Sequence, residues 1–344
     1  MTRLSRAPLL LLIASPLVAQ APTPVVTAQV SGTGSLLQAV SVLDANHVWV
    51  SGHAATYAWS ADGGASWHPS TVAGADSLQF RDLHAVSPST AYLMAAGPGD
   101  KSGVWKTQDG GATWARQFTN TDAKAFYDCM AFWTPTTGFA FSDGVDRHLP
   151  IAETTDGEHW ALLGPTPPAV EPGEGSFAAS GTCAVTFGDG RAAITTGNGP
   201  VARVFLTDDR WHTWRSVNTP LVATEGAGAT TIAVRDPRHF VVLGGTIGGK
   251  ATGPRVARTS DGGQTWQLGG DLPFTGAVFG SAYAHVGKAS VLVAVGPGGA
   301  AYSLDDGATW RPLHDGPYWS VGFGPDGRGW MVGPKGRITR VDWR

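Results

Sequence analysis

The sequence predicts an all-β fold built from repeated four-stranded units. A short phrase, an Asp turn followed by a Trp, occurs six times, and its Asp residues are Asp62, Asp109, Asp156, Asp209, Asp261 and Asp305. Four copies are clear, the copy at residues 155–160 lacks one residue, and the copy at residues 207–214 has Trp211 where the others have glycine. Their spacings of 47, 47, 53, 52 and 44 residues are typical of a repeat architecture. Between the phrases, apolar residues cluster or alternate without a sustained helical period, which favours strands over helices.

Seven segments have the pattern of a first strand, although only six Asp phrases occur. These segments are residues 38–42, 83–86, 128–132, 181–185, 230–234, 280–284 and 319–323. The seventh unit reaches the end of the chain before a good fourth strand, and the strand near residues 25–30 can supply it. A seven-bladed β-propeller of antiparallel blades, closed by the N-terminal strand, accounts for the seven first strands and the six Asp phrases. It also leaves only short sheet edges.

The predicted blades share a single domain over residues 22–344. Their ranges are 36–72, 80–120, 126–163, 177–218, 228–270, 278–314, and 317–344 together with 24–31.

The first 21 residues have the pattern of an export signal. Arg3 and Arg6 precede a short apolar stretch over residues 9–18, and Ala19-Gln20-Ala21 is a small-x-small cleavage site. The stretch is too short to span a bilayer. We therefore expect a periplasmic or secreted protein that starts near Pro22 and has no stable membrane insertion.

Composition narrows the function classes. The net charge of −3 and the absence of a Lys/Arg run argue against a nucleic-acid partner. His148, His159 and His212 lack metal-ligand spacing, and no glycine-rich phosphate motif follows a strand, so we expect no metal and no cofactor. We also expect a monomer. For Cys129 and Cys183 we expect two separate buried thiols, with a disulfide as the alternative.

The repeated phrase predicts a structural role. Its Asp carboxylate can accept hydrogen bonds from amides of the following turn, its glycine allows a positive φ, and its Trp starts the next strand and packs between blades. A carboxylate saturated by such bonds is a poor proton shuttle. The residues assigned to this role are Asp62 and Trp67, Asp109 and Trp114, Asp156 and Trp160, Asp209 and Trp214, Asp261 and Trp266, and Asp305 and Trp310.

The phrase resembles the Asp-box of BNR-repeat propellers. The wider unit, Gly103-Val104-Trp105-Lys106-Thr107-Gln108-Asp109-Gly110-Gly111-Ala112-Thr113-Trp114, resembles the photosystem II stability/assembly factor family and its exported bacterial relatives, over about residues 30–344. This resemblance implies a seven-bladed propeller and favours a protein-assembly or scaffold role. Sialidases, xyloglucan-active glycosidases and sortilin-type receptors carry the same box, so the box specifies the fold and not the function.

The alternation of loops predicts where a binding site lies. The Asp phrases join strands three and four, so they share one face of the disc with the turns between strands one and two. The opposite face, here called the loop-rich face, carries the long segments 97–103, 142–149, 164–179 and 244–255. Variable loops on a repeating scaffold are where binding sites are normally placed.

First strands enter the central channel from the loop-rich face, so their opening residues are predicted to ring its mouth. The candidate ligand-binding residues are Arg81, Asp82, Tyr127, Asp128, Asp143, Arg147, Glu174, Ser180, Tyr318 and Trp319. We expect a protein or glycan partner at this mouth and no catalysis. In the alternative interpretation, Arg81 and Asp82 pair with neighbours while Tyr318 and Trp319 only fill the channel.

A glycoside hydrolase is the competing functional hypothesis. It would use two of Asp82, Asp128, Asp143 and Glu174 as an acid and a base or nucleophile. No local motif marks a pair of these carboxylates, and the sialidase Arg-Ile-Pro signature is absent.

Overall fold

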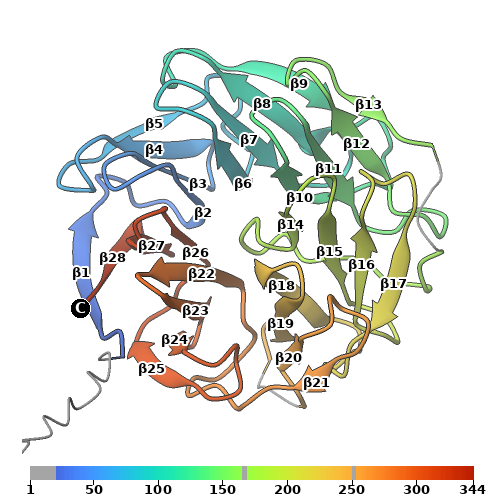
Figure 1. Cartoon of the computed structure of the whole chain (residues 1–344). Helices are drawn as coiled ribbons and strands as arrows, with labels where there is room; N and C mark the ends of the chain where they lie inside the picture. The colour runs from blue at the N-terminus through green and yellow to red at the C-terminus, as the bar shows by residue number, and fades with distance from the viewer. Residues whose placement is uncertain (1–20, 165–168, 250–252) are drawn as a thin grey trace, which may run out of the picture.

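The computed structural model describes residues 21–164, 169–249 and 253–344. Within these ranges, 28 strands form seven four-stranded sheets around a central axis (Figure 1), and the only helical element is a short 3-10 turn at Gly99–Lys101. The predicted seven-bladed β-propeller is confirmed. The predicted export signal lies almost entirely outside the described residues. No helix of the described ranges has the length and apolar character of a membrane span.

Six blades each use four consecutive strands, paired antiparallel. Blade 1 contains β2 (Leu37–Val42), β3 (Val48–Gly52), β4 (Thr56–Ser60) and β5 (His68–Thr71). Blade 2 contains β6 (Phe80–Ala85), β7 (Ala91–Ala95), β8 (Gly103–Thr107) and β9 (Ala115–Thr119). Blade 3 contains β10 (Tyr127–Phe132), β11 (Gly138–Ser142), β12 (Ile151–Thr154) and β13 (Ala161–Leu162). Blade 4 contains β14 (Ala184–Thr186), β15 (Ala192–Thr196), β16 (Arg203–Thr207) and β17 (Arg215–Asn218). Blade 5 contains β18 (Ala227–Asp236), β19 (His239–Thr246), β20 (Val256–Thr259) and β21 (Gln267–Leu268). Blade 6 contains β22 (Gly280–Val286), β23 (Ala289–Gly296), β24 (Gly299–Ser303) and β25 (Arg311–His314).

The seventh blade closes the ring by joining the two ends of the chain. It contains β26 (Ser320–Phe323), β27 (Gly329–Val332), β28 (Arg337–Trp343) and β1 (Pro24–Val30). β1 pairs antiparallel with β28, in a register that runs from Pro24 opposite Trp343 to Val30 opposite Arg337. Figure 1 shows this junction as a blue strand beside a red one. All strands lie inside the predicted blade ranges, except that β18 begins one residue earlier.

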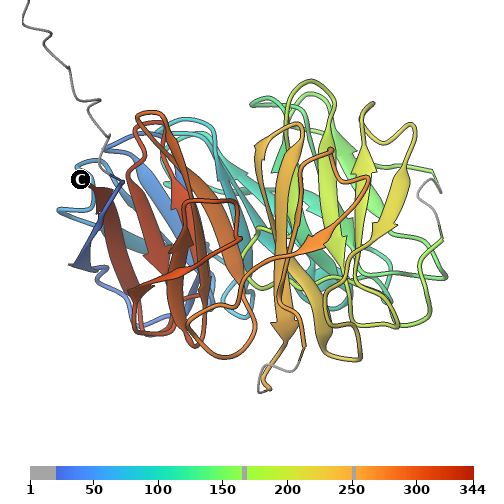
Figure 2. The same cartoon turned by 60° about the horizontal axis from the view of Figure 1, so that its bottom comes forward.

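The hydrophobic cores lie between neighbouring blades. Between blades 1 and 2, for example, the buried Trp49 and Leu93 share one cluster with Trp105, and Trp114 packs edge-on against Trp49 at 6.3 Å between ring centroids. Burying a large aromatic side chain stabilises the fold by roughly 1.5–3 kcal/mol, so these clusters hold the blades together. Figure 2 shows the strands as upright ribbons, with the loops gathered at the two faces.

The Asp phrases form hydrogen-bonded turns between third and fourth strands. In blade 2, Asp109 accepts hydrogen bonds from the Thr113 amide (2.8 Å) and the Thr113 hydroxyl (2.6 Å). The hydroxyl bond, together with the amide, lowers the pKa of Asp109 to about 2. Gly111, at φ +91°, leaves room for Tyr57 of blade 1, whose hydroxyl donates to the Gly111 carbonyl.

Blade 4 replaces the glycines of this turn with Arg210 and Trp211, which nevertheless keep positive φ values of 53° and 72°. The Trp211 indole is buried between blades 3 and 4, where it stacks on Trp214 and meets Phe139 edge-on. Burial of this large ring offsets the strained backbone conformation.

Cys129 and Cys183 form a disulfide, with 6.0 Å between their Cα atoms. The expectation of two separate thiols is therefore wrong. Cys129 lies in β10 and Cys183 directly precedes β14. The first strands of adjacent blades run side by side at the channel, which brings together two residues 54 positions apart.

Candidate functional site

The most unusual feature of the channel is a stretch of blade 4 that lies inside it. Residues 181–185 were predicted as a first strand, but β14 begins only at Ala184. The residues before it, here called the crossing segment (residues 176–182), leave the sheet, and the chain ahead of β14 loops towards the centre of the ring (Figure 1).

Three consecutive carbonyl groups of the crossing segment accept hydrogen bonds from side chains of three different blades. The pairs are Arg81 Nη1 to Ala178 (3.4 Å), Gln38 Nε2 to Ala179 (3.3 Å) and Ser320 Oγ to Ser180 (3.0 Å). These donors come from β6, β2 and β26 respectively. Side chains at the openings of the first strands thus bind the main chain of this segment.

The crossing segment also contacts the remaining blades. The Ser180 hydroxyl donates to the Phe279 carbonyl at 2.6 Å, just before β22 of blade 6. The Thr182 hydroxyl lies 2.7 Å from that of Thr231 in blade 5, and the Asp128 carboxyl of blade 3 accepts from the Ala178 backbone. The segment therefore links its own blade to the other six, and Ser180 serves this linkage.

Asp82 holds blade 3 and the crossing segment in place. Its carboxylate accepts hydrogen bonds from the amides of Leu83 and Met130, each at 2.7 Å. Gly181, at φ +74°, packs directly against this carboxylate, and a Cβ atom there would lie 2.2 Å from Asp82 Oδ1. Burial raises the pKa of Asp82 to about 7, although the two amides act in the opposite direction. Asp82 is thus buried below the mouth and not displayed at it.

Asp128 and Asp143 form a hydrogen-bonded pair of carboxyl groups. Asp128 is 1% exposed, and burial followed by the neighbouring Asp143 raises its pKa well above the usual range, while Arg81 acts in the opposite direction. Burial also raises the pKa of Asp143, which accepts from the Ser176 amide at 2.7 Å. Two carboxyl groups in hydrogen-bond contact are closer together than the roughly 5–9.5 Å that separates the paired carboxyl groups of glycoside hydrolases.

Glu174 forms a buried ion pair with Arg203, bonded through both carboxylate oxygens. The Thr196 hydroxyl donates to the same carboxylate at 2.6 Å. This fully satisfied carboxylate anchors the loop before the crossing segment to blade 4, and it does not face the channel mouth as expected.

The predicted positions of Tyr127 and Tyr318 at the channel mouth are wrong, because both side chains are buried between blades. Successive side chains of a strand point to opposite faces, so Tyr127 packs against Phe118 at 5.1 Å while the next residue, Asp128, points towards the crossing segment. The Tyr318 hydroxyl is hydrogen-bonded to His314 (3.0 Å) and Thr339 (2.9 Å).

Four of the predicted residues retain exposed surface, and Asp143, described above, is one of them. Arg81 is partly exposed, lies over the Phe126 ring at 5.9 Å and donates to Gln79. Trp319 is partly exposed and meets Phe279 edge-on at 5.3 Å. Arg147 is exposed in the loop between β11 and β12.

Sequence reasoning missed Gln38 and His53. Gln38 opens the first strand of blade 1, as Arg81 and Asp128 do in blades 2 and 3, so matching the repeats position by position could have found it. Three buried atoms in this region lack a hydrogen-bond partner: Gln38 Oε1, His53 Nε2 and Asp128 Oδ2. Burial, and then the charge of Arg81, lower the pKa of His53. Unsatisfied buried polar atoms of this kind are typical of sites that take up water or a ligand.

A hollow of about 780 Å³ opens beside Phe279 on the loop-rich face. Its walls are small or apolar residues, namely Gly248, Gly249, Thr275, Gly276, Ala277, Phe279, Pro297 and Gly298. Within the described ranges, no group of three or more His, Cys, Asp or Glu side chains is arranged to hold a metal ion.

Comparison with known proteins places the fold among characterised propellers. No protein-family model matches the chain, and no curated protein matches it. The chain resembles a solved structure of YCF48 bound to a D1 peptide, with a TM-score of 0.63, 17% identity, and coverage of 95% of this chain and 99% of that one. YCF48 from Cyanidioschyzon merolae gives a TM-score of 0.64, 14% identity, and coverage of 92% and 98%. A streptogramin B lyase gives a TM-score of 0.65, 13% identity, and coverage of 93% and 98%. At these identities the likeness is one of fold, which this chain shares with YCF48 and with a streptogramin B lyase.

Proposed function

We propose that this protein is an exported, monomeric and non-catalytic propeller that binds an extended segment of a protein partner at the channel mouth, in an assembly or scaffold role. One observation carries the proposal. Side chains of three blades already bind consecutive carbonyl groups of the crossing segment, whose backbone is irregular and makes no strand pairing of its own. Main-chain hydrogen bonds of this kind provide affinity for an extended peptide, while neighbouring hollows select its side chains.

The surface around the crossing segment suits such a partner. Arg81 in β6 and Trp319, directly before β26, are both partly exposed, and the hollow begins at Phe279. Arginine and tryptophan are the residue types that contribute most to protein interfaces. The peptide-bound structure of YCF48 supports the idea that a propeller of this fold can serve as a peptide receptor.

Glycoside hydrolysis has little support from the four carboxylates proposed for it. Asp82 is bound by two amides, Glu174 is paired with Arg203, and Asp128 and Asp143 are bonded to each other. Asp82, Asp128 and Glu174 are buried, and Asp143 alone of the four retains exposed surface. The fold itself does not decide the matter, since a streptogramin B lyase shares it.

Export is part of the proposal and has two supports. The first 21 residues have the composition of a secretory signal, and the Cys129–Cys183 disulfide suits an oxidising compartment. Cleavage near Ala21 would leave β1 intact, since β1 begins at Pro24. Mass spectrometry of the protein recovered from its native host should find Pro22 at or near the mature N-terminus.

Capture from the native cell envelope tests the binding role. Wild-type protein should recover a protein partner, and Arg81→Ala and Trp319→Ala should each reduce recovery at least fivefold. The charge-matched control is Lys288→Ala, which removes an exposed cation from the turn between β22 and β23 on the Asp-phrase face. Equal recovery by all variants would contradict the proposed site. Cleavage of any glycan in a parallel screen, lost in Asp128→Ala, would contradict the non-catalytic assignment.

A further inference from the structure

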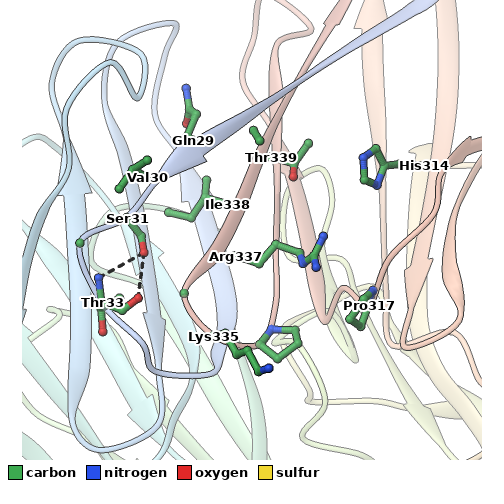
Figure 3. Close-up of a pocket in the computed structure, with 14 residues that line it drawn as sticks. Gln29, Val30, Ser31, Thr33, His314, Pro317, Lys335, Arg337, Ile338 and Thr339 are labelled. Carbon is green, nitrogen blue, oxygen red and sulfur yellow. Dashed lines mark hydrogen bonds between the residues drawn. The ribbon is translucent and has the colours of Figure 1, made fainter.

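A second pocket lies at the junction where the ring closes. It has a volume of about 620 Å³ and is here called the rim pocket (Figure 3). It is lined by residues 28–33 from the end of β1, by residues 334–339 around the start of β28, and by His314 and Pro317 from the connection between blades 6 and 7. It shares no lining residue with the channel-mouth site.

The ionisable side chains that line the rim pocket are all basic. It contains Arg337, Lys335 and His314, and no Asp or Glu. The neighbouring arginines of this blade, Arg328 and Arg340, both pair with Asp342 at 2.9 Å. The described residues provide no such carboxylate for Arg337.

Arg337 itself has an unsatisfied donor. Its Nε atom is buried without a hydrogen-bond partner, and its guanidinium lies over the Tyr318 ring at 5.6 Å. Figure 3 shows the guanidinium extending from β28 towards His314 and Pro317. A buried N–H group without an acceptor is costly, and an incoming anion would remove that cost.

Several of the remaining lining residues are apolar. Val30 is 88% exposed at the end of β1, and Pro317 and Pro334 form further walls. Ser31 is already bonded to the backbone of Thr33, as the dashed lines in Figure 3 show, so it does not compete for Arg337. The volume falls within the range of small-molecule sites, roughly 300–1,000 Å³.

We propose that the rim pocket binds a small organic carboxylate, with its carboxylate on Arg337 and its apolar body against Val30 and Pro317. The planar fork of an arginine matches a carboxylate through two parallel hydrogen bonds. Lys335, exposed at the edge, adds attraction without a fixed geometry. This site is independent of the protein-binding role proposed above.

Titration with 4-fluorobenzoate, followed by fluorine NMR, tests the proposal on the mature chain. The probe should bind wild-type protein, and Arg337→Gln should weaken binding at least tenfold. Because Arg337 also contacts Tyr318, a second variant protects the test from misfolding. Val30→Asp changes an exposed side chain, places a negative charge at the pocket and should abolish binding. Lys288→Ala should bind as wild type does.

Two comparison probes define the chemistry. 4-Fluorobenzylamine has the same body and the opposite charge, and it should not bind. Phenyl phosphate should bind no more tightly than the carboxylate. The proposal is overturned if wild-type protein does not bind 4-fluorobenzoate, if binding survives both Arg337→Gln and Val30→Asp, or if the amine or the phosphate is preferred.

Discussion

Replacing Gly181 by Ala tests the packing of the crossing segment most sharply. Gly181 has φ +74°, where an Ala costs about 1–2 kcal/mol. The new Cβ would also lie 2.2 Å from Asp82 Oδ1 and 2.6 Å from Asp82 Cγ, so the carboxylate and its two amide bonds must shift. Overpacking of this kind costs about 1–3 kcal/mol. The free energy of unfolding should therefore fall by roughly 2–5 kcal/mol in a urea titration.

Gly74→Ala is the matched control for this variant. Gly74 has φ +75°, and nothing lies within 4 Å of the position of its added Cβ. The free energy of unfolding of Gly74→Ala should fall only by the backbone cost of about 1–2 kcal/mol. If both variants lose the same stability, Gly181 is not packed against Asp82 and the described course of the crossing segment is wrong.

Three further variants probe the same framework. Removing the disulfide in Cys129→Ala/Cys183→Ala should lower the free energy of unfolding by about 4 kcal/mol for a 54-residue separation, and unchanged thermal unfolding would contradict this. The pKa of Asp82 is about 7 in the folded protein and near 4 when unfolded, so its contribution to stability is full below pH 4 and is lost as the pH rises to 7. The stability difference between wild type and Asp82→Asn should change over that window, and a constant difference would refute the assignment. Trp211→Gly restores the glycine of the other turns and relieves about 1–2 kcal/mol of backbone strain, but it leaves a cavity that costs about 3–5 kcal/mol. The free energy of unfolding measured by calorimetry should therefore fall, and an unchanged or higher value would contradict this.

The blade arrangement could be predicted because each repeat carries its own local signals. The Asp phrases mark the turns before fourth strands, and the surplus first strand requires closure by β1, as observed. Both signals depend on residues close together in the sequence. The order of the strands therefore follows from local signals, whereas the predicted strand at residues 181–185 begins only at Ala184.

The candidate site was harder to predict because it depends on contacts between distant residues. Nothing local indicates that residues 176–182 leave their sheet, because the hydrogen bonds that hold them come from other blades. Successive side chains of a strand point to opposite faces, so a prediction that is wrong by one position exchanges an inward-facing residue for one buried between blades. Tyr127 is buried between blades, whereas its neighbour Asp128 faces the crossing segment. The pairing of Cys129 with Cys183 likewise follows from neighbouring first strands and not from spacing.

Site-specific photo-crosslinking tests the central claim most directly. A benzophenone amino acid is placed at Trp319, beside the crossing segment, or at Lys288, on the Asp-phrase face, and the cells that export the protein are irradiated. The proposed function predicts a covalent protein adduct from position 319 that disappears in the Arg81→Ala background, and none from position 288. Adducts from position 288 alone, or from neither position, would contradict a partner site at the channel mouth.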